Sequence, residues 1–91
     1  MIWMDLPHGE AIPKRGDRLQ TTRTTYWVLT VRQVKRRDAM ARPRVVMRVL
    51  KSEDVEQELR EALLRSAARR GGSMVFEFAW YPRKKRMVPL V

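Results

Sequence analysis

Arginine side chains are concentrated on one short stretch of the chain, between Val31 and Lys51. This stretch, VRQVKRRDAMARPRVVMRVLK, holds eight basic residues and a single acid, Asp38. The planar guanidinium of arginine donates paired hydrogen bonds to phosphate and carboxylate oxygens. The cluster therefore predicts contact with a polyanion. Its alternative is a set of solvated side chains that are screened by salt or neutralised by acids elsewhere in the chain.

The charge of the whole chain is also strongly basic and unevenly distributed. The 91 residues include 20 Lys and Arg and 10 Asp and Glu, for a net charge of +10, and fifteen of the twenty basic residues are arginine. Five of the ten acids fall between residues 53 and 61, so the chain outside residues 53–70 carries sixteen basic and five acidic residues. A one-sided charge distribution of this kind steers anions toward the basic side.

Two β-strands are predicted to carry the arginines, over residues 24–37 and 44–51. Both are rich in β-branched and aromatic residues, and Asp38 and Pro43 favour a turn between them. Pairing Val34 with Val46 keeps a single apolar face on the hairpin. The residues predicted on that face are Trp27, Leu29, Val31, Val45, Met47 and Val49.

The same register sets arginine against arginine on the other face of the hairpin. Arg32 is expected opposite Arg48, and Arg36 opposite Arg44. Like charges that lie directly opposite each other destabilise a sheet. Burial of one large apolar side chain contributes about 1.5–3 kcal/mol, so burial is expected to decide the register. A bound polyanion would turn the remaining repulsion into attraction.

A second basic cluster, RKKR at residues 83–86, directly follows the last predicted strand. Tyr81 leads into this cluster, and Tyr26 is expected on the arginine face. Aromatic side chains beside a basic groove stack on nucleic-acid bases, although both tyrosines can equally be ordinary half-buried sheet residues. The predicted nucleic-acid-binding residues are therefore Arg32, Arg36, Arg44, Arg48, Arg83, Lys84, Lys85, Arg86, Tyr26 and Tyr81.

One helix is predicted over residues 53–70, with Ser52 as its N-cap and Gly71-Gly72 as its stop. Acids crowd its start and arginines its end, as the helix macrodipole favours. Its narrow apolar stripe consists of Val55, Leu59, Ala62, Leu63, Ser66 and Ala67, and Leu64 lies outside it. A last strand over residues 74–81 is expected to meet this stripe through Met74, Phe76, Phe78 and Trp80.

The chain is predicted to form one small basic domain over residues 1–91. Residues 1–16 are expected to be irregular, a turn at Gly16-Asp17 to begin the first main strand, and residues 83–91 to form a basic and then apolar tail. The predicted fold class is α+β. It consists of a twisted, mostly antiparallel sheet of four or five strands, or a half-closed small barrel, with one amphipathic helix packed on it.

The opening PKRGDRLQT, followed by a long bent strand, resembles the small SH3-like and PUA-like barrels that bind nucleic acid. The resemblance covers about a third of the chain, and it implies a small barrel and a nucleic-acid ligand. A helix between the last strands departs from a plain SH3-like barrel. Fold by itself does not determine function.

Residues with the spacing of a catalytic or metal site are missing. The chain has no cysteine, and its one histidine, His8, has only Asp5 and Glu10 nearby, without the spacing of a zinc site. Gly71-Gly72 ends a helix and cannot form a phosphate-binding loop. We therefore expect no enzymatic activity, metal or cofactor. The start has no signal-peptide pattern and no apolar run is long enough to cross a membrane, so a cytoplasmic location is expected.

Two functions remain open from the sequence. The first is a non-enzymatic nucleic-acid-binding module that contacts the phosphates of DNA or RNA. The alternative is a small protein–protein adaptor or assembly subunit, phage-type or regulatory, that docks on an acidic partner. That alternative would use the arginines together with Leu64 and the apolar end of the chain, MVPLV.

Overall fold

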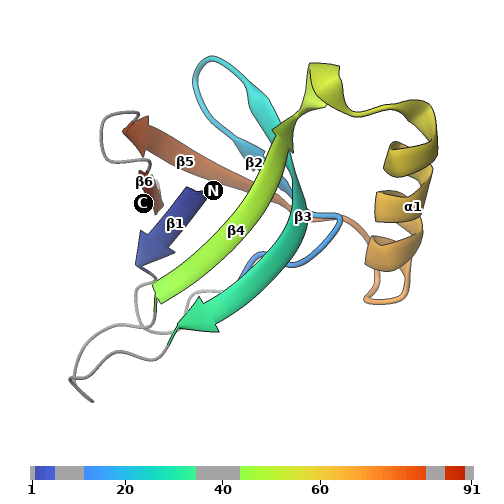
Figure 1. The fold of residues 1–91 in the computed structure, drawn as a ribbon, viewed down its shortest axis with the longest axis horizontal. Coiled ribbons are helices and arrows are strands. Elements are labelled where there is room, and N and C mark those ends of the chain that lie inside the picture. The colour runs from blue at the N-terminus through green and yellow to red at the C-terminus, as the bar shows by residue number, and fades with distance from the viewer. Residues whose placement is uncertain (1, 6–11, 35–43, 82–85, 90–91) are drawn as a thin grey trace.

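The computed structural model describes residues 2–5, 12–34, 44–81 and 86–89, with side-chain positions for residues 12–34 and 44–79. Figure 1 shows how the elements of this part of the chain are arranged. In chain order they are β1 (Ile2–Asp5), β2 (Arg18–Gln20), β3 (Thr25–Val34), β4 (Arg44–Lys51), the 3-10 turn η1 (Ser52–Asp54), α1 (Gln57–Ala68), β5 (Val75–Tyr81) and β6 (Arg86–Pro89).

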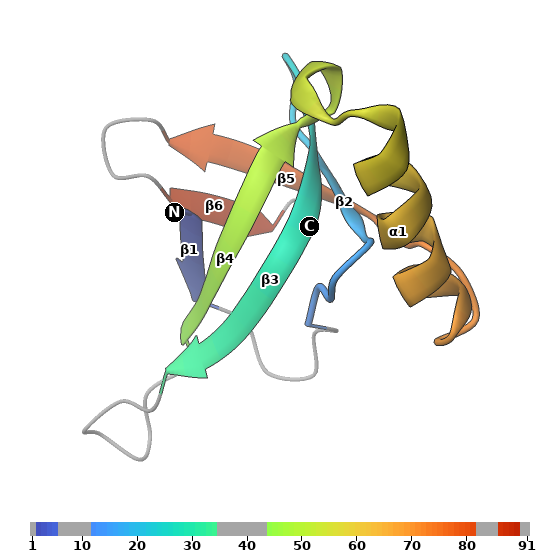
Figure 2. The same cartoon turned by 45° about the vertical axis from the view of Figure 1, so that its right-hand side comes forward.

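The strands follow the order β1-β4-β3-β2-β5-β6, and the ring closes between β1 and β6. That closing contact is a single residue pair, Trp3 with Arg86. Among the neighbouring pairs only β2–β5 and β1–β6 are parallel in the described residues. The four central strands form a twisted mixed sheet with α1 packed on its outer side, seen from a second angle in Figure 2. The predicted α+β fold is confirmed.

The two short strands at the ends of the chain lie in segments where little regular structure was predicted. β1 falls within the segment expected to be irregular, and β6 falls within the expected tail. β6 pairs with β5, so that Phe78 lies opposite Pro89 and Tyr81 lies opposite Arg86, and β1 pairs with β4. The end of the chain is therefore part of the sheet.

A β-bulge in β3 divides its side chains between two apolar cores. β3 pairs with β4 in two registers that meet at Leu29, which has no partner in the ladder. The extra residue reverses the alternation of side chains along the strand. As a result Trp27 and Leu29 face α1, whereas Val28 and Val31 face the interior of the barrel. The single core face predicted for this hairpin is wrong for that reason.

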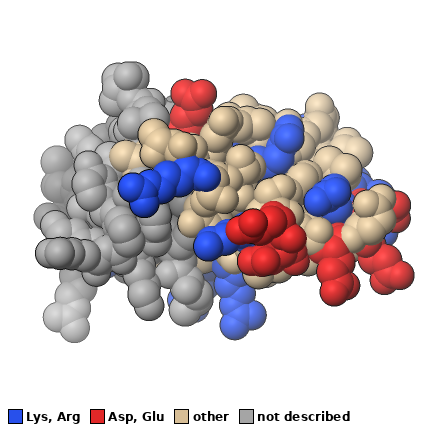
Figure 3. Space-filling model, turned by 90° about the horizontal axis from the view of Figure 1, so that it is seen from above, with Lys and Arg blue, Asp and Glu red and all other residues tan. Residues whose placement is uncertain are grey.

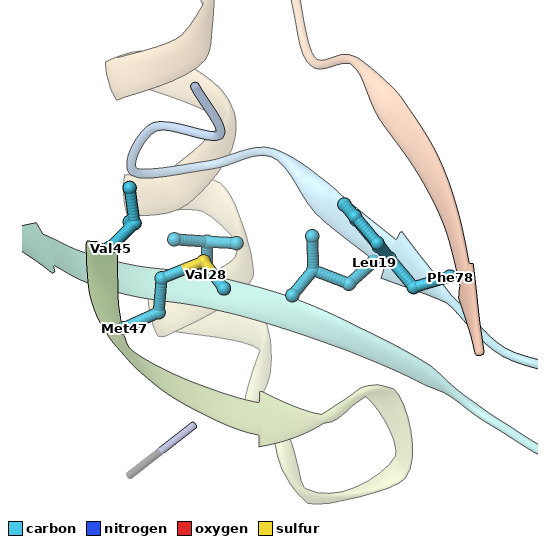
Figure 4. Close-up of a cluster of buried hydrophobic side chains, with 5 residues drawn as sticks. All are labelled: Leu19, Val28, Val45, Met47 and Phe78. Atoms are coloured by element: carbon cyan, nitrogen blue, oxygen red, sulfur yellow. The ribbon is translucent and has the colours of Figure 1, made fainter. Parts of the chain in front are cut away.

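The interior core joins residues from four strands, as the close-up in Figure 4 shows. Phe76 and Phe78 of β5, predicted to meet the helix, belong to this core, and their ring centroids are 6.2 Å apart. Met74, also predicted to be buried, is 52% exposed, and the side chain of Trp80 lies outside the described part. The buried members of the core are Leu19, Val28, Val45, Met47 and Phe78.

The second core lies between α1 and the outer side of the sheet. The predicted apolar stripe of the helix is confirmed, because Leu63 and Ala67 are buried and Leu64, outside the stripe, is 44% exposed. The stripe packs on side chains of β3 and β4 and not on β5. This core consists of Trp27, Val55 and Leu63, with Leu29, Leu50 and Leu59 packed against it.

The helix begins four residues later than predicted and ends at Ala68, two residues before the predicted end. Its N-cap residue is Glu56, which makes no side-chain capping bond, and Ser52 instead accepts a hydrogen bond from the indole Nε1 of Trp27 at 3.4 Å. At the other end the N–H of Gly72 donates to the carbonyl of Ala67 at 3.0 Å, and both glycines have positive φ. This is the glycine stop that the sequence predicted.

The predicted turn at Gly16-Asp17 is the point where three segments meet. Asp17 is 1% exposed, and its carboxylate accepts hydrogen bonds from the backbone N–H groups of Lys14 (2.9 Å) and Met74 (3.0 Å) and from Nη2 of Arg70 (3.1 Å). Gly16, with φ of 92°, lies against α1, where an added Cβ would collide with the carbonyl of Leu63. The turn therefore holds β2, the end of α1 and the start of β5 together.

Replacing Gly16 by alanine is expected to lower the free energy of unfolding by about 2–5 kcal/mol, measured by urea denaturation. The methyl group is overpacked against the helix, which costs about 1–3 kcal/mol, and the positive φ costs about 1–2 kcal/mol more. Gly71→Ala is the matched control, since Gly71 also has positive φ but no atom lies within 4 Å of its added Cβ. Equal losses in the two variants would contradict the close packing.

Replacing Asp17 by asparagine is expected to lower the free energy of unfolding by about 2–4 kcal/mol. The amide preserves the shape but leaves Arg70 without its ion pair and turns an NH2 group toward groups that can only donate. Thermal unfolding followed by circular dichroism measures the loss. Arg70→Met is expected to cost less, because it leaves the carboxylate its two backbone donors. The reverse order would show that the ion pair matters more than the backbone bonds.

Candidate functional site

Acidic side chains gather near one end of the hairpin formed by β3 and β4, among basic ones, and the far end of the hairpin carries arginines. The acids lie after β4, on η1 and along the first half of α1. Of the seven acids with described side chains, five are in this region: Glu53, Asp54, Glu56, Glu58 and Glu61. Figure 3 shows most of the acidic atoms over η1 and α1, at the right of the view. The far ends of β3 and β4, at the lower left in Figure 1, carry arginines instead.

The outer side of this far end forms what we call the arginine surface, which consists of Thr30, Arg32, Arg44, Val46 and Arg48. Four of these residues, all except Arg44, line a depression on the protein surface. Arg32 and Arg48 are exposed, and within the described part of the chain neither makes a hydrogen bond or an ion pair. Arg44 is half-buried and has contacts of its own. Two guanidiniums are therefore presented to solvent with their donors available.

The predicted opposition of Arg32 and Arg48 is wrong. Arg32 pairs with Val46, and Arg48 pairs with Thr30, because the register after the bulge is displaced by two residues from the predicted one. Because side chains alternate along a strand, a shift of two residues in the pairing leaves the same side chains on the same side of the sheet. The arginines therefore still share one side. They are now diagonal neighbours with Cβ atoms about 7–8 Å apart, which weakens their repulsion.

The other predicted pair, Arg36 with Arg44, is also replaced. Arg44 pairs with Val34 on one side and with Asp5 of β1 on the other. Arg36 lies outside the described residues, as do Arg83, Lys84 and Lys85.

A continuous row of paired residues connects the hairpin with the second basic cluster. Arg32 pairs with Val46, Val46 with Trp3, Trp3 with Arg86 and Arg86 with Tyr81. Neighbouring strands are about 4.8 Å apart, so the backbones of Arg32 and Arg86 are separated by about 14 Å along the sheet. Residues 54 positions apart in the chain are thus brought into one row, which contains the predicted site positions Arg32, Tyr81 and Arg86.

Tyr26 is not part of the arginine surface. It precedes the bulge, pairs with Lys51 and packs against the interior core. It also lines a separate depression at the other end of β3, together with Arg23, Lys51, Glu53 and the threonines of the β2–β3 turn. The prediction placed it beside Arg32 because it assumed an uninterrupted strand.

Two further arginines are held by contacts inside the fold. Arg15 donates from Nη1 to the carbonyl of Leu29 at 3.0 Å and from Nε to the hydroxyl of Ser66 at 3.2 Å. It thereby donates to the carbonyl of Leu29, the residue at the bulge that has no partner in the ladder. Arg70 is bound to Asp17. Part of the high arginine content therefore has a structural use, which composition alone does not reveal.

Other kinds of site find little support in the described residues. No group of three or more His, Asp or Glu side chains in this part of the chain is close enough to hold a metal ion. His8 lies outside the described part. Among the described residues no helix has the length and apolar character needed to cross a membrane.

The double variant Arg32→Gln/Arg48→Gln is expected to keep the free energy of unfolding within about 1 kcal/mol of the native value, because exposed side chains without partners contribute little to stability. Urea denaturation measures this. A larger loss would show that these arginines hold the hairpin together, and would remove the basis for treating them as available to a ligand.

Comparisons of the chain with protein-family models, curated proteins and solved structures found no match. No matching protein supports the resemblance to SH3-like or PUA-like barrels. A functional assignment therefore rests on the chemistry of the surfaces described above.

Proposed function

We propose that the chain is a non-enzymatic nucleic-acid-binding module that uses the arginine surface to contact phosphates. The observation that carries this proposal is the exposure of Arg32 and Arg48, which have no partner in the described part of the chain and lie at the end of the hairpin away from the acids. Among the described residues, folding gives these two guanidinium groups no hydrogen-bond acceptor and no counter-charge. The phosphates of a polyanion would supply both.

The strength of this contact would come mainly from released counterions. Each phosphate neutralised by arginine releases condensed salt ions, so affinity falls steeply as salt rises. Arginine also binds phosphate with two parallel hydrogen bonds, which fixes orientation as well as charge. Because Arg32 and Arg48 extend from paired strands, their backbones are positioned before the ligand arrives, and only side-chain freedom is lost on binding.

The row from Arg32 to Arg86 supports a ligand that crosses the strands. A polyanion laid along this row meets the arginine surface first and the position of Arg86 about 14 Å further on. Phosphate contacts of this kind carry no sequence information, and both DNA and RNA provide them. A preference between the two would come from residues other than these arginines.

The alternative, docking of an acidic protein through the apolar end of the chain, loses part of its basis. Met87, Val88 and Pro89 pair with Trp80, Ala79 and Phe78 in the sheet. Removing residues 87–91 would therefore remove β6 and disturb the fold, so such a deletion does not separate the two functions.

Fluorescence anisotropy with labelled single-stranded and duplex DNA and RNA, over a salt series, tests the proposal. The native chain is expected to bind with a clear salt dependence, and Arg32→Gln/Arg48→Gln is expected to reduce the slope of log K against log salt by about two. The control is Arg65→Gln/Arg69→Gln, in the last turn of α1 and at its C-cap, which removes the same charge from two exposed positions outside the arginine surface.

Equal losses in the two double variants would mean that only net charge matters. Unchanged binding in Arg32→Gln/Arg48→Gln would remove the arginine surface from the proposal. Absence of binding at low salt would contradict the proposed function as a whole.

A further inference from the structure

Arg18 differs from the other arginines because its guanidinium rests on an aromatic ring. Arg18 of β2 pairs with Trp27 of β3, and its Cζ atom lies 5.5 Å from the centre of the indole ring. A cation over an aromatic face is attracted by the ring quadrupole, more strongly where water is excluded. Trp27 is itself fixed in the core beneath α1. The guanidinium is therefore held in one place before any ligand binds.

The donors of this guanidinium have no acceptor in the described part of the chain. The Nε atom of Arg18 is buried and unpaired, and no hydrogen bond or ion pair is made by its other nitrogens. Arg15 and Arg70, by contrast, both donate to oxygen atoms. An arginine carries five N–H donors, and leaving them unpaired away from water is unfavourable. An anion that reaches the exposed edge of Arg18 would satisfy them.

The neighbours of Arg18 on this side of the sheet are apolar. Val75 of β5 pairs with Arg18 and is 46% exposed. The backbone carbonyl of Met74 accepts a hydrogen bond from the N–H of Arg18 at 2.9 Å, which keeps the two segments together. Arginine is enriched in protein–protein interfaces, where its guanidinium meets acidic groups beside apolar contacts.

A nucleic acid fits this position poorly. Arg32 lies about 17 Å from Trp27 along β3, and Arg48 lies on β4, separated from Arg18 on β2 by Trp27 of β3. The next exposed pair on this side is Gln20 with Glu77, whose carboxylate repels a chain of phosphates. A protein segment can place one carboxylate on the guanidinium and an apolar group beside it.

We infer that Arg18 and Val75 form a docking surface for a protein segment that presents a carboxylate next to an apolar side chain. The carboxylate accepts hydrogen bonds from the guanidinium of Arg18, and the apolar side chain covers Val75. This inference does not depend on the proposed function. With both surfaces in use, the chain would connect a protein to a nucleic acid.

Titration of the isotope-labelled chain with the capped peptide Ac-Asp-Leu-Asp-Leu-NH2, followed by NMR, tests the inference. The Trp27 indole N–H, the Arg18 Nε–H and the Val75 methyl signals are expected to shift together and to saturate. Two comparison peptides separate the contributions. Ac-Asn-Leu-Asn-Leu-NH2 lacks the carboxylates and Ac-Asp-Ser-Asp-Ser-NH2 lacks the apolar groups. Both are expected to bind at least about tenfold more weakly than the first peptide.

Three variants separate binding from stability. Arg18→Met keeps an apolar stem over Trp27 and removes the donors, so it is expected to fold and to bind the first peptide at least about tenfold more weakly. Arg18→Lys keeps the charge, and its affinity for the first peptide is expected to lie between that of Arg18→Met and that of the native chain. Arg65→Met on α1 removes the same charge from an exposed position and is expected to bind like the native chain.

Several outcomes would overturn the inference. One is the absence of saturable shifts at Arg18, Trp27 and Val75. Another is equal weakening by Arg18→Met and Arg65→Met, which would indicate attraction by net charge only. If Arg18→Met fails to fold, the titration of the native chain with the three peptides still tests whether the carboxylate and the apolar group are both needed for binding. Larger shifts at Arg18 with a labelled oligonucleotide than with the peptide would assign this surface to nucleic acid instead.

Discussion

The structure depends most on the buried carboxylate of Asp17. Burying a charge is costly unless it is paired and hydrogen-bonded, and this one meets both conditions through Arg70 and two backbone N–H groups. The backbone of the same residue pairs with Val28, so β3 is attached at the same point. The end of α1, the start of β5 and the middle of β3 are thus positioned by one residue. Gly16 allows this by letting the helix approach the turn without a side chain in between.

The bulge at Leu29 determines how one strand serves two cores. Without it, Val31 would lie on the same side of β3 as Trp27 and Leu29, as a regular alternation requires. With it, the strand fills the interior of the barrel through Val28 and Val31 and supports α1 through Trp27 and Leu29. Arg15 stabilises the distortion by donating to the carbonyl of Leu29. The arrangement of the arginine surface is a consequence, because the bulge also sets the register of Arg32 and Arg48.

The arginines of the described chain have different uses. Arg15 and Arg70 hold the fold through oxygen acceptors, whereas Arg32 and Arg48 face solvent beyond the bulge. Arg18 is fixed by an aromatic ring and lacks an acceptor. The two surfaces proposed here lie on different parts of the sheet and differ in their neighbours. Around Arg32 these are further cations, which suit a polyanion, and around Arg18 they are apolar groups, which suit a protein segment.

The sequence by itself determined the elements whose signals are local. The apolar stripe of α1, the glycine stop after it, the turn at Gly16-Asp17 and the α+β class all follow from short-range patterns, and the sharing of one face by Arg32, Arg44 and Arg48 follows from strand alternation. The bulge, the start of α1 at Gln57 and the pairing of Trp3 with Arg86 could not be predicted. Each depends on contacts between distant segments, since the local pattern of β3 does not show that Leu29 packs against α1 while Val31 packs in the interior. The row that joins Arg32 to Arg86 was decided by tertiary structure for the same reason, because closing the sheet is what brings residues from the two ends of the chain together.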